Sequence, residues 1–129
     1  MSSNNLQLIA VVLALLGAPA PLRAADEEKR ILGEWVGTFR PNETISLTFG
    51  PVNRVTLRFA DGVEKGTYAL DLTRKPPHLD LHGRPGRPQG GIRTIVEFLP
   101  GDRLRIEDNA PGNPRPARFS EHSLVLKKK

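Results

Sequence analysis

Hydrophobic and polar residues alternate in short segments along most of the chain after residue 33. In one segment Ile45, Leu47 and Phe49 alternate with Ser46 and Thr48. Such period-two alternation is typical of a strand with one buried face. The predicted strands span residues 34–39, 45–49, 55–59, 66–72, 79–81, 92–98, 103–107 and 123–126. Eight short strands at close spacing predict an all-β domain.

Turn residues separate these segments. Asp61-Gly62 is a tight hairpin signal between two predicted strands. Pro76 marks another turn, because a proline restricts the residue before it and donates no ladder hydrogen bond. Successive hairpins favour an antiparallel up-and-down barrel of about eight strands, since closure removes exposed strand edges. Residues 26–32 place acids before bases, which suits the helix dipole and predicts one or two helical turns ending at Gly33.

The first 25 residues have the composition of a secretory signal peptide. An uninterrupted apolar run spans residues 8–18, and small residues follow up to Ala25. The run is too short for a membrane span of about 20 residues, and the alternative is a buried N-terminal helix. We therefore expect export to the periplasm or the exterior, and one mature domain spanning residues 26–129. We expect this domain to have no membrane span and to be a monomer.

The chain is basic, with a formal net charge of +5. Loss of residues 1–25 would remove one base, Arg23, and no acid, which leaves +4. A basic balance indicates attraction to anionic polymers or surfaces, but does not by itself indicate specific nucleic-acid binding. The chain has no cysteine, so that a disulfide and a cysteine nucleophile are both excluded.

Two sets of residues resemble known families. Gly33 and Trp35 after a short helix resemble the Gly-x-Trp start of lipocalins. Several segments together resemble a lipocalin-like family of small secreted proteins expanded in planctomycetes. They are Leu32-Gly-Glu-Trp35, Gly66-Thr-Tyr-Ala-Leu-Asp71, Lys75-Pro76 with Leu79-Asp80-Leu81, Gly101-Asp102-Arg-Leu104 with Ile106, and Pro114-Arg115-Pro116 with Phe119.

The resemblance implies a lipocalin-like barrel whose closed end is plugged by Trp35, often beneath an arginine from a late strand. We therefore expect Arg115 or Arg118 to stack on Trp35. The chain departs from the family pattern at Pro77, Arg93 and Glu107. The family has no established activity, so the resemblance implies a fold and a compartment but no reaction. The residues for which we expect structural roles are Gly33, Trp35, Asp71, Pro76, Asp102 and Arg115.

His78, Asp80 and His82 form the sharpest chemical candidate. On a strand these positions share one face, and two imidazoles with a carboxylate could bind Zn²⁺ or Fe²⁺. The alternative is that Leu79 and Leu81 face the core and the three polar side chains face solvent. We favour the alternative, because a closed metal site needs about four ligands. We expect no cofactor.

The remaining sequence favours a non-enzymatic protein, because no serine sits in a Gly-x-Ser-x-Gly elbow. The barrel mouth is the default place for a small apolar ligand or a peptide, although the same side chains could simply fill the core. A second hypothesis is a protein that docks a partner or an anionic polymer through the basic Pro/Gly loops at residues 83–91 and 109–116. A metal-dependent enzyme ranks last. The inward-facing candidates for the ligand site are Phe49, Leu57, Phe59, Tyr68, Ile95 and Phe98.

Overall fold

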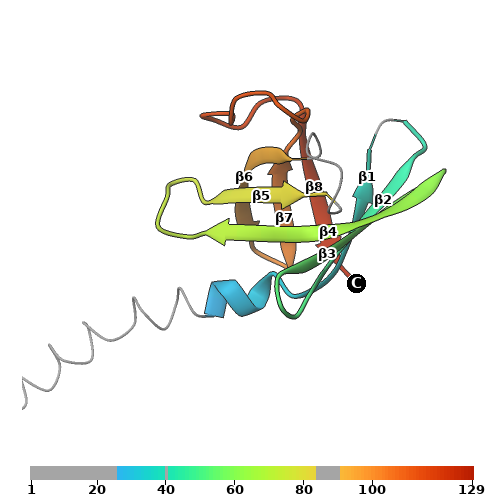
Figure 1. The fold of residues 1–129 in the computed structure, drawn as a ribbon, viewed down its shortest axis with the longest axis horizontal. Coiled ribbons are helices and arrows are strands. Elements are labelled where there is room, and N and C mark those ends of the chain that lie inside the picture. Colours follow the sequence, from blue (N-terminus) through green and yellow to red (C-terminus); the bar gives the residue numbers. More distant parts are fainter. Residues whose placement is uncertain (1–25, 40, 84–90) are drawn as a thin grey trace, which may run out of the picture.

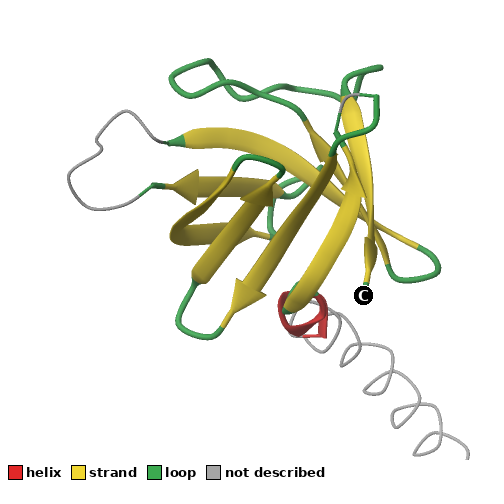
Figure 2. Cartoon of the chain, turned by 90° about the vertical axis from the view of Figure 1, so that its right-hand side faces the viewer, coloured by secondary structure: helices red, strands yellow, loops and turns green. Residues whose placement is uncertain are grey.

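The computed structural model describes residues 26–39, 41–83 and 91–129, which form one closed antiparallel barrel of eight strands (Figure 1). Each strand pairs with its neighbour in sequence. The last strand closes the barrel on the first, through Trp35 opposite Lys128 and Val36 opposite Lys127. A short helix at residues 26–30 lies against one end of the barrel (Figure 2). The predicted up-and-down barrel with an N-terminal helix is confirmed. The predicted signal peptide, residues 1–25, lies outside the described residues.

The strand bounds follow the alternating segments closely. The predicted fourth strand is longer than expected, because the hairpin at Asp61 brings Gly62–Gly66 into register with β3. The last strand runs past its predicted end at residue 126 and includes Lys127 and Lys128. The strands are β1 (Gly33–Thr38), β2 (Thr44–Gly50), β3 (Arg54–Phe59), β4 (Gly62–Asp71), β5 (His78–His82), β6 (Ile92–Leu99), β7 (Arg103–Glu107) and β8 (Ser123–Lys128).

The inward side chains form one hydrophobic core. The register places Leu47 of β2 between Trp35 of β1 and Leu57 of β3. Tyr68 and Leu81 are opposite each other on β4 and β5. The buried members of this core are Ile31, Trp35, Ile45, Leu47, Phe49, Val55, Tyr68, Leu79, Leu81, Val96, Leu104, Ile106 and Leu126.

Trp35 plugs the end of the barrel that the helix covers. Its side chain is fully buried, and its indole Nε1 donates a hydrogen bond of 2.8 Å to the carbonyl of Ile31. The cation above its ring is Lys128, whose Nζ lies 5.1 Å from the ring centroid and donates to the carbonyl of Arg30 at 2.8 Å. The prediction of Arg115 or Arg118 at this place is therefore wrong. Lys128 comes from the strand that closes the barrel beside β1, whereas Arg115 lies on the connection before it.

Gly33 has the structural role expected of it. Its φ of 122° is a backbone conformation that side chains disfavour, and a Cβ there would lie 3.1 Å from Cε of Lys128. The helix is also fastened on its other side. Arg30 donates a hydrogen bond of 2.9 Å to the carbonyl of Leu99, and its guanidinium lies 5.3 Å from the ring centroid of Phe98. The plug thus joins both ends of the domain's sequence.

The connection between β7 and β8, residues 108–122, folds back over the outside of the barrel. Arg115 donates to the carbonyl of Thr94 at 2.7 Å and forms a salt bridge of 2.6 Å with Asp80. Ser120 donates two hydrogen bonds to the buried carboxylate of Glu107. Phe119 lies beneath the guanidinium of Arg105, 4.8 Å from the ring centroid. Arg115 therefore has a structural role, but on the outer face of β5 and β6.

The remaining predicted structural residues occupy turns. Asp71 accepts hydrogen bonds from the hydroxyl and the backbone N–H of Thr73, and these bonds hold the pKa of its carboxyl below the usual value. The Lys75–Pro76 peptide bond in the same turn is cis. Asp102 has a left-handed φ of 54° between β6 and β7. In the described part of the chain, no helix has the length and apolar character needed to cross a membrane.

Candidate functional site

The barrel interior contains an apolar cavity of about 230 Å³. It lies between the middle layer of the core and the end of the barrel opposite the Trp35 plug. Strands β2, β3, β5, β6, β7 and β8 all contribute inward side chains, because their alternation points every second residue to the same interior. The lining residues are Phe39, Ile45, Leu47, Leu57, Phe59, Leu81, Ile92, Thr94, Ile106, Glu107, Asp108, Asn109, Leu124 and Leu126.

The volume of this cavity limits what it can hold. A dry apolar cavity of about 150 Å³ is enough for benzene, and pockets for drug-sized ligands start near 300 Å³. The cavity therefore suits a molecule slightly larger than a benzene ring. Phe39 and Phe59 give it aromatic walls at the open end, and Leu57 and Leu81 are nearer the middle of the barrel.

Three of the polar residues around the cavity, Thr94, Glu107 and Asn109, are engaged in structure. The hydroxyl of Thr94 donates to the carbonyl of Glu107. The amide of Asn109 donates to the carbonyl of Arg93 at 2.7 Å and of Pro114 at 3.1 Å. These bonds hold the start of the β7–β8 connection across the barrel end. Apolar side chains form most of the remaining wall, which Asp108 also borders.

The structure brings only two of the six predicted ligand residues to the cavity, Leu57 and Phe59. Phe49 and Tyr68 are packed edge to face, with ring centroids 4.9 Å apart, in the part of the core nearer the plug. Burial, with a smaller effect from Glu28, raises the pKa of the Tyr68 hydroxyl. Phe98 lies at the closed end beneath Arg30. These three residues are core, as the alternative prediction had it.

The prediction that Ile95 faces inward is wrong. Ile95 is opposite His78 on the outer face of β6, because its neighbours Thr94 and Val96 take the inward positions. It is nevertheless only 1% exposed. The β7–β8 connection, which carries Arg115 to the carbonyl of Thr94, covers this face. A buried outward residue cannot be recognised from local alternation.

Most residues of the cavity wall carry no sequence signal that separates them from ordinary core. Phe39 is the last residue of a predicted strand, and Ile45, Leu47 and Leu81 have the alternation of ordinary core residues. Their alternation does show that they face inward. Which inward residues border an empty volume depends on how side chains from six strands meet, and the chain carries no local signal for that.

His78, Asp80 and His82 all lie on the outer face of β5, since Leu79 and Leu81 face the core. The carboxylate of Asp80 is bound by Arg115. Burial, followed by the positive charges of Arg115 and Arg74, lowers the pKa of His78. Among the described residues, no three histidine, aspartate or glutamate side chains form a group that could hold a metal ion. The structure thus gives Asp80 a salt-bridge partner in place of a metal.

The structure describes the two predicted basic loops, residues 83–91 and 109–116, to different extents. Residues 84–90, which include Arg84 and Arg87, lie outside the described residues. In the other loop, the guanidinium of Arg115 is directed onto the barrel and pairs with Asp80, with its side chain 20% exposed. Arg115 is therefore not presented to a partner in solution.

We compared the chain with protein-family models, with curated proteins and with solved structures, and none of the three comparisons gave a match. Membership of the lipocalin-like planctomycete family stays a prediction that rests on the sequence segments quoted above.

Proposed function

We propose that this protein is an exported, non-enzymatic binding module that holds a small apolar molecule in the mouth of its barrel. The observation that supports this proposal is the cavity of about 230 Å³ whose walls are mainly leucine, isoleucine and phenylalanine side chains. An eight-stranded barrel is just wide enough to be filled by its own side chains or to hold one small ligand. Here part of the interior is left open.

The two ends of the barrel are built differently, which is consistent with a single entrance. Trp35, the helix and Lys128 close one end through hydrogen bonds and a cation–π contact. The cavity lies toward the other end, where Phe39 and Asn109 border it. One end closed by the Trp35 plug and one open end lined by apolar side chains together favour storage or transport of a ligand. Export follows from the predicted signal peptide.

Native mass spectrometry of the purified protein tests the proposal. We expect a fraction of molecules to retain a small apolar compound, which is released when the protein unfolds. Leu57→Trp should remove that retained mass, because the larger side chain projects into the cavity. Val125→Trp is the matched control, since Val125 is 48% exposed on the outer side of β8. Retention by Leu57→Trp equal to wild type would contradict a ligand in this cavity.

A further inference from the structure

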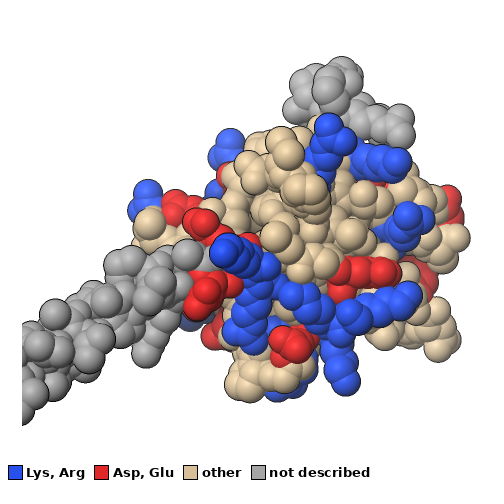
Figure 3. All heavy atoms as spheres, turned by 90° about the horizontal axis from the view of Figure 1, so that it is seen from below, with Lys and Arg blue, Asp and Glu red and all other residues tan. Residues whose placement is uncertain are grey.

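Three cations lie together on the outer face of β3 and β4. Arg54 and Arg58 face outward on β3, because Val55 and Leu57 take the alternate positions. Lys65 is directly opposite Thr56, the residue midway between the two arginines. All three basic side chains are exposed. Seen from below, the molecule carries many Lys and Arg side chains with Asp and Glu side chains among them (Figure 3).

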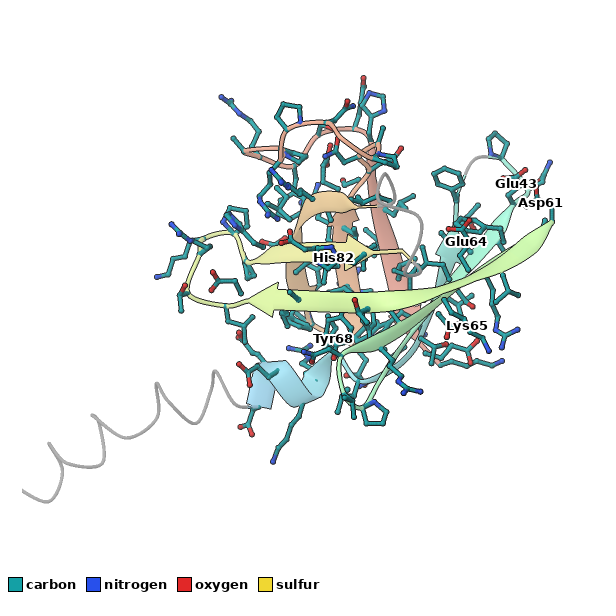
Figure 4. The ribbon with its side chains drawn as sticks, in the orientation of Figure 1. Glu43, Asp61, Glu64, Lys65, Tyr68 and His82 are labelled. Carbon is teal, nitrogen blue, oxygen red and sulfur yellow. The ribbon has the colours of Figure 1, made fainter. Side chains whose placement is uncertain are left out.

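These cations have no acidic partner in the described part of the chain. The described salt bridges involve Arg74, Arg105, Arg115, His122 and Lys129, and none involves Arg54, Arg58 or Lys65. Glu64 is paired with Leu57, which faces the barrel interior. Glu64 therefore lies on the other side of β4 from Lys65 (Figure 4). The positive charge on this face is thus available to an external anion.

A hollow of about 460 Å³ lies beside Arg58, the one of the three cations that lines it. Its walls include outward residues of β1, β2 and β3, with Ser46 and Val36 neighbouring each other on β2 and β1, together with Phe59 and Ala60. Arg58 lines one side. Lys129 and Glu34 both line another side, where the Nζ of Lys129 lies 3.9 Å from the carboxylate of Glu34. The hydroxyls of Thr44 and Ser46 and the amide of Asn42 also line the hollow.

We propose that this face binds an acidic polysaccharide, with one sugar unit in the hollow and successive carboxylates on Arg58, Lys65 and Arg54. The spacing favours a polymer. Arg54 and Arg58 are four residues apart, which is about 13 Å along a strand, and Lys65 is one strand away at about 5 Å. A single small anion cannot contact all three. A chain with regularly spaced charges can.

The side chains between the cations favour a sugar over other polyanions. Ser46, Thr48, Thr56 and Thr67 line this face between the basic groups, and hydroxyl groups can hydrogen-bond sugar hydroxyls. Single-stranded nucleic acid binds by stacking successive bases on several aromatic rings, and among the described residues this surface offers one aromatic side chain, Phe59, at the hollow. A membrane surface is met by an apolar face, whereas the outward residues of β3 are Arg54, Thr56 and Arg58.

Binding of an oligogalacturonate by the purified protein, measured by calorimetry, tests the proposal. We expect saturable, salt-sensitive binding to the oligogalacturonate and none to a neutral glucan of equal length. The variant Arg54→Gln/Arg58→Gln/Lys65→Gln should bind at least ten-fold more weakly. Arg54→Lys/Arg58→Lys keeps the charge and should lose far less. Ser46→Ala should weaken binding only in the oligogalacturonate assay and leave the retained apolar ligand unchanged.

The matched control is Lys75→Gln/Arg93→Gln/Arg118→Gln, which removes the same charge from exposed positions outside this face. It should bind within about two-fold of wild type. Equal weakening in the two triple variants would overturn the proposal, because net charge alone would then explain binding. So would absence of binding to the oligogalacturonate. Tighter binding to a single-stranded oligonucleotide or to phosphatidylglycerol vesicles, lost in the same triple variant, would overturn the assignment to a polysaccharide.

Discussion

Arg115 reaches from the β7–β8 connection to Asp80 on β5, where its Nη2 lies 2.6 Å from the carboxylate Oδ1. The same guanidinium donates to the carbonyl of Thr94 on β6. This one side chain therefore fastens the longest connection of the barrel to two strands that precede it in sequence. It also engages the carboxylate that the sequence offered as a metal ligand.

Replacing Arg115 should weaken the fold measurably. Arg115→Met leaves the Asp80 carboxylate and the Thr94 carbonyl without their donor, and we expect a loss of about 2 kcal/mol in the free energy of unfolding. Urea denaturation measures it. Arg118→Met is the matched control, because Arg118 is exposed, and should change stability by less than about 0.5 kcal/mol. Equal effects of the two substitutions would show that the salt bridge contributes nothing specific.

Lys128 should stabilise the closed end of the barrel. Lys128→Met removes the cation above Trp35 and the donor to the carbonyl of Arg30, and we expect a loss of about 1–2 kcal/mol. Trp35 is the only tryptophan, so its fluorescence reports the change at the plug during unfolding. Lys127→Met alters the adjacent exposed lysine and should leave both the spectrum and the midpoint unchanged. An unfolding midpoint and a Trp35 fluorescence spectrum of Lys128→Met equal to those of wild type would refute this role.

Gly66 marks a close approach of β4 to the end of β5. A Cβ at Gly66 would overlap the carbonyl oxygen of His82, which is backbone and cannot swing aside. Gly66→Ala should therefore cost about 3 kcal/mol, as overpacking does. Gly62→Ala, on the same strand, meets nothing within 4 Å and should be tolerated. Thermal melts of the two variants give the comparison, and similar melting temperatures would contradict the close approach.

His78 should make stability depend on pH. Burial, Arg115 and Arg74 lower its pKa below the ordinary value of 6.5, while Asp71 and Asp80 act in the opposite direction. The unfolded chain then binds the proton more readily than the folded protein, so stability falls as the pH drops through 6.5 and levels off below the folded pKa. Urea midpoints at pH 5 and pH 8 measure this fall. It should be smaller in His78→Gln, and an unchanged or larger fall would contradict the prediction.

Alternation predicted the barrel well, because one buried face forces a period of two on every strand. It failed where both faces are buried. Ile95 and Val96 are adjacent apolar residues on β6, and nothing local shows that Ile95 is covered from outside by the β7–β8 connection. It failed again at the three C-terminal lysines, whose identical side chains give no alternation, although Lys128 faces the plug.

The cavity could be predicted only as a region. Leu57 and Phe59 were identified because inward residues of a barrel near its mouth can contact a ligand, and both line the cavity. Phe49, Tyr68 and Phe98 have the same local pattern but lie nearer the plug. Position along the barrel axis depends on the stagger of all eight strands. The same holds for the outer face of β3 and β4. Alternation shows that Arg54, Arg58 and Lys65 face outward, but the sequence does not show that they lie side by side.

Titration of the purified protein with toluene, followed through its methyl signals by nuclear magnetic resonance, tests the binding function most directly. Toluene is close in size to what a cavity of about 230 Å³ can hold. We predict saturable shifts at the methyl groups of Leu57, Leu81 and Ile92, which line the cavity, and none at Ile95 on the outer face of β6. Unchanged methyl signals at the three lining residues, or equal shifts at Ile95, would contradict a ligand site in the barrel mouth.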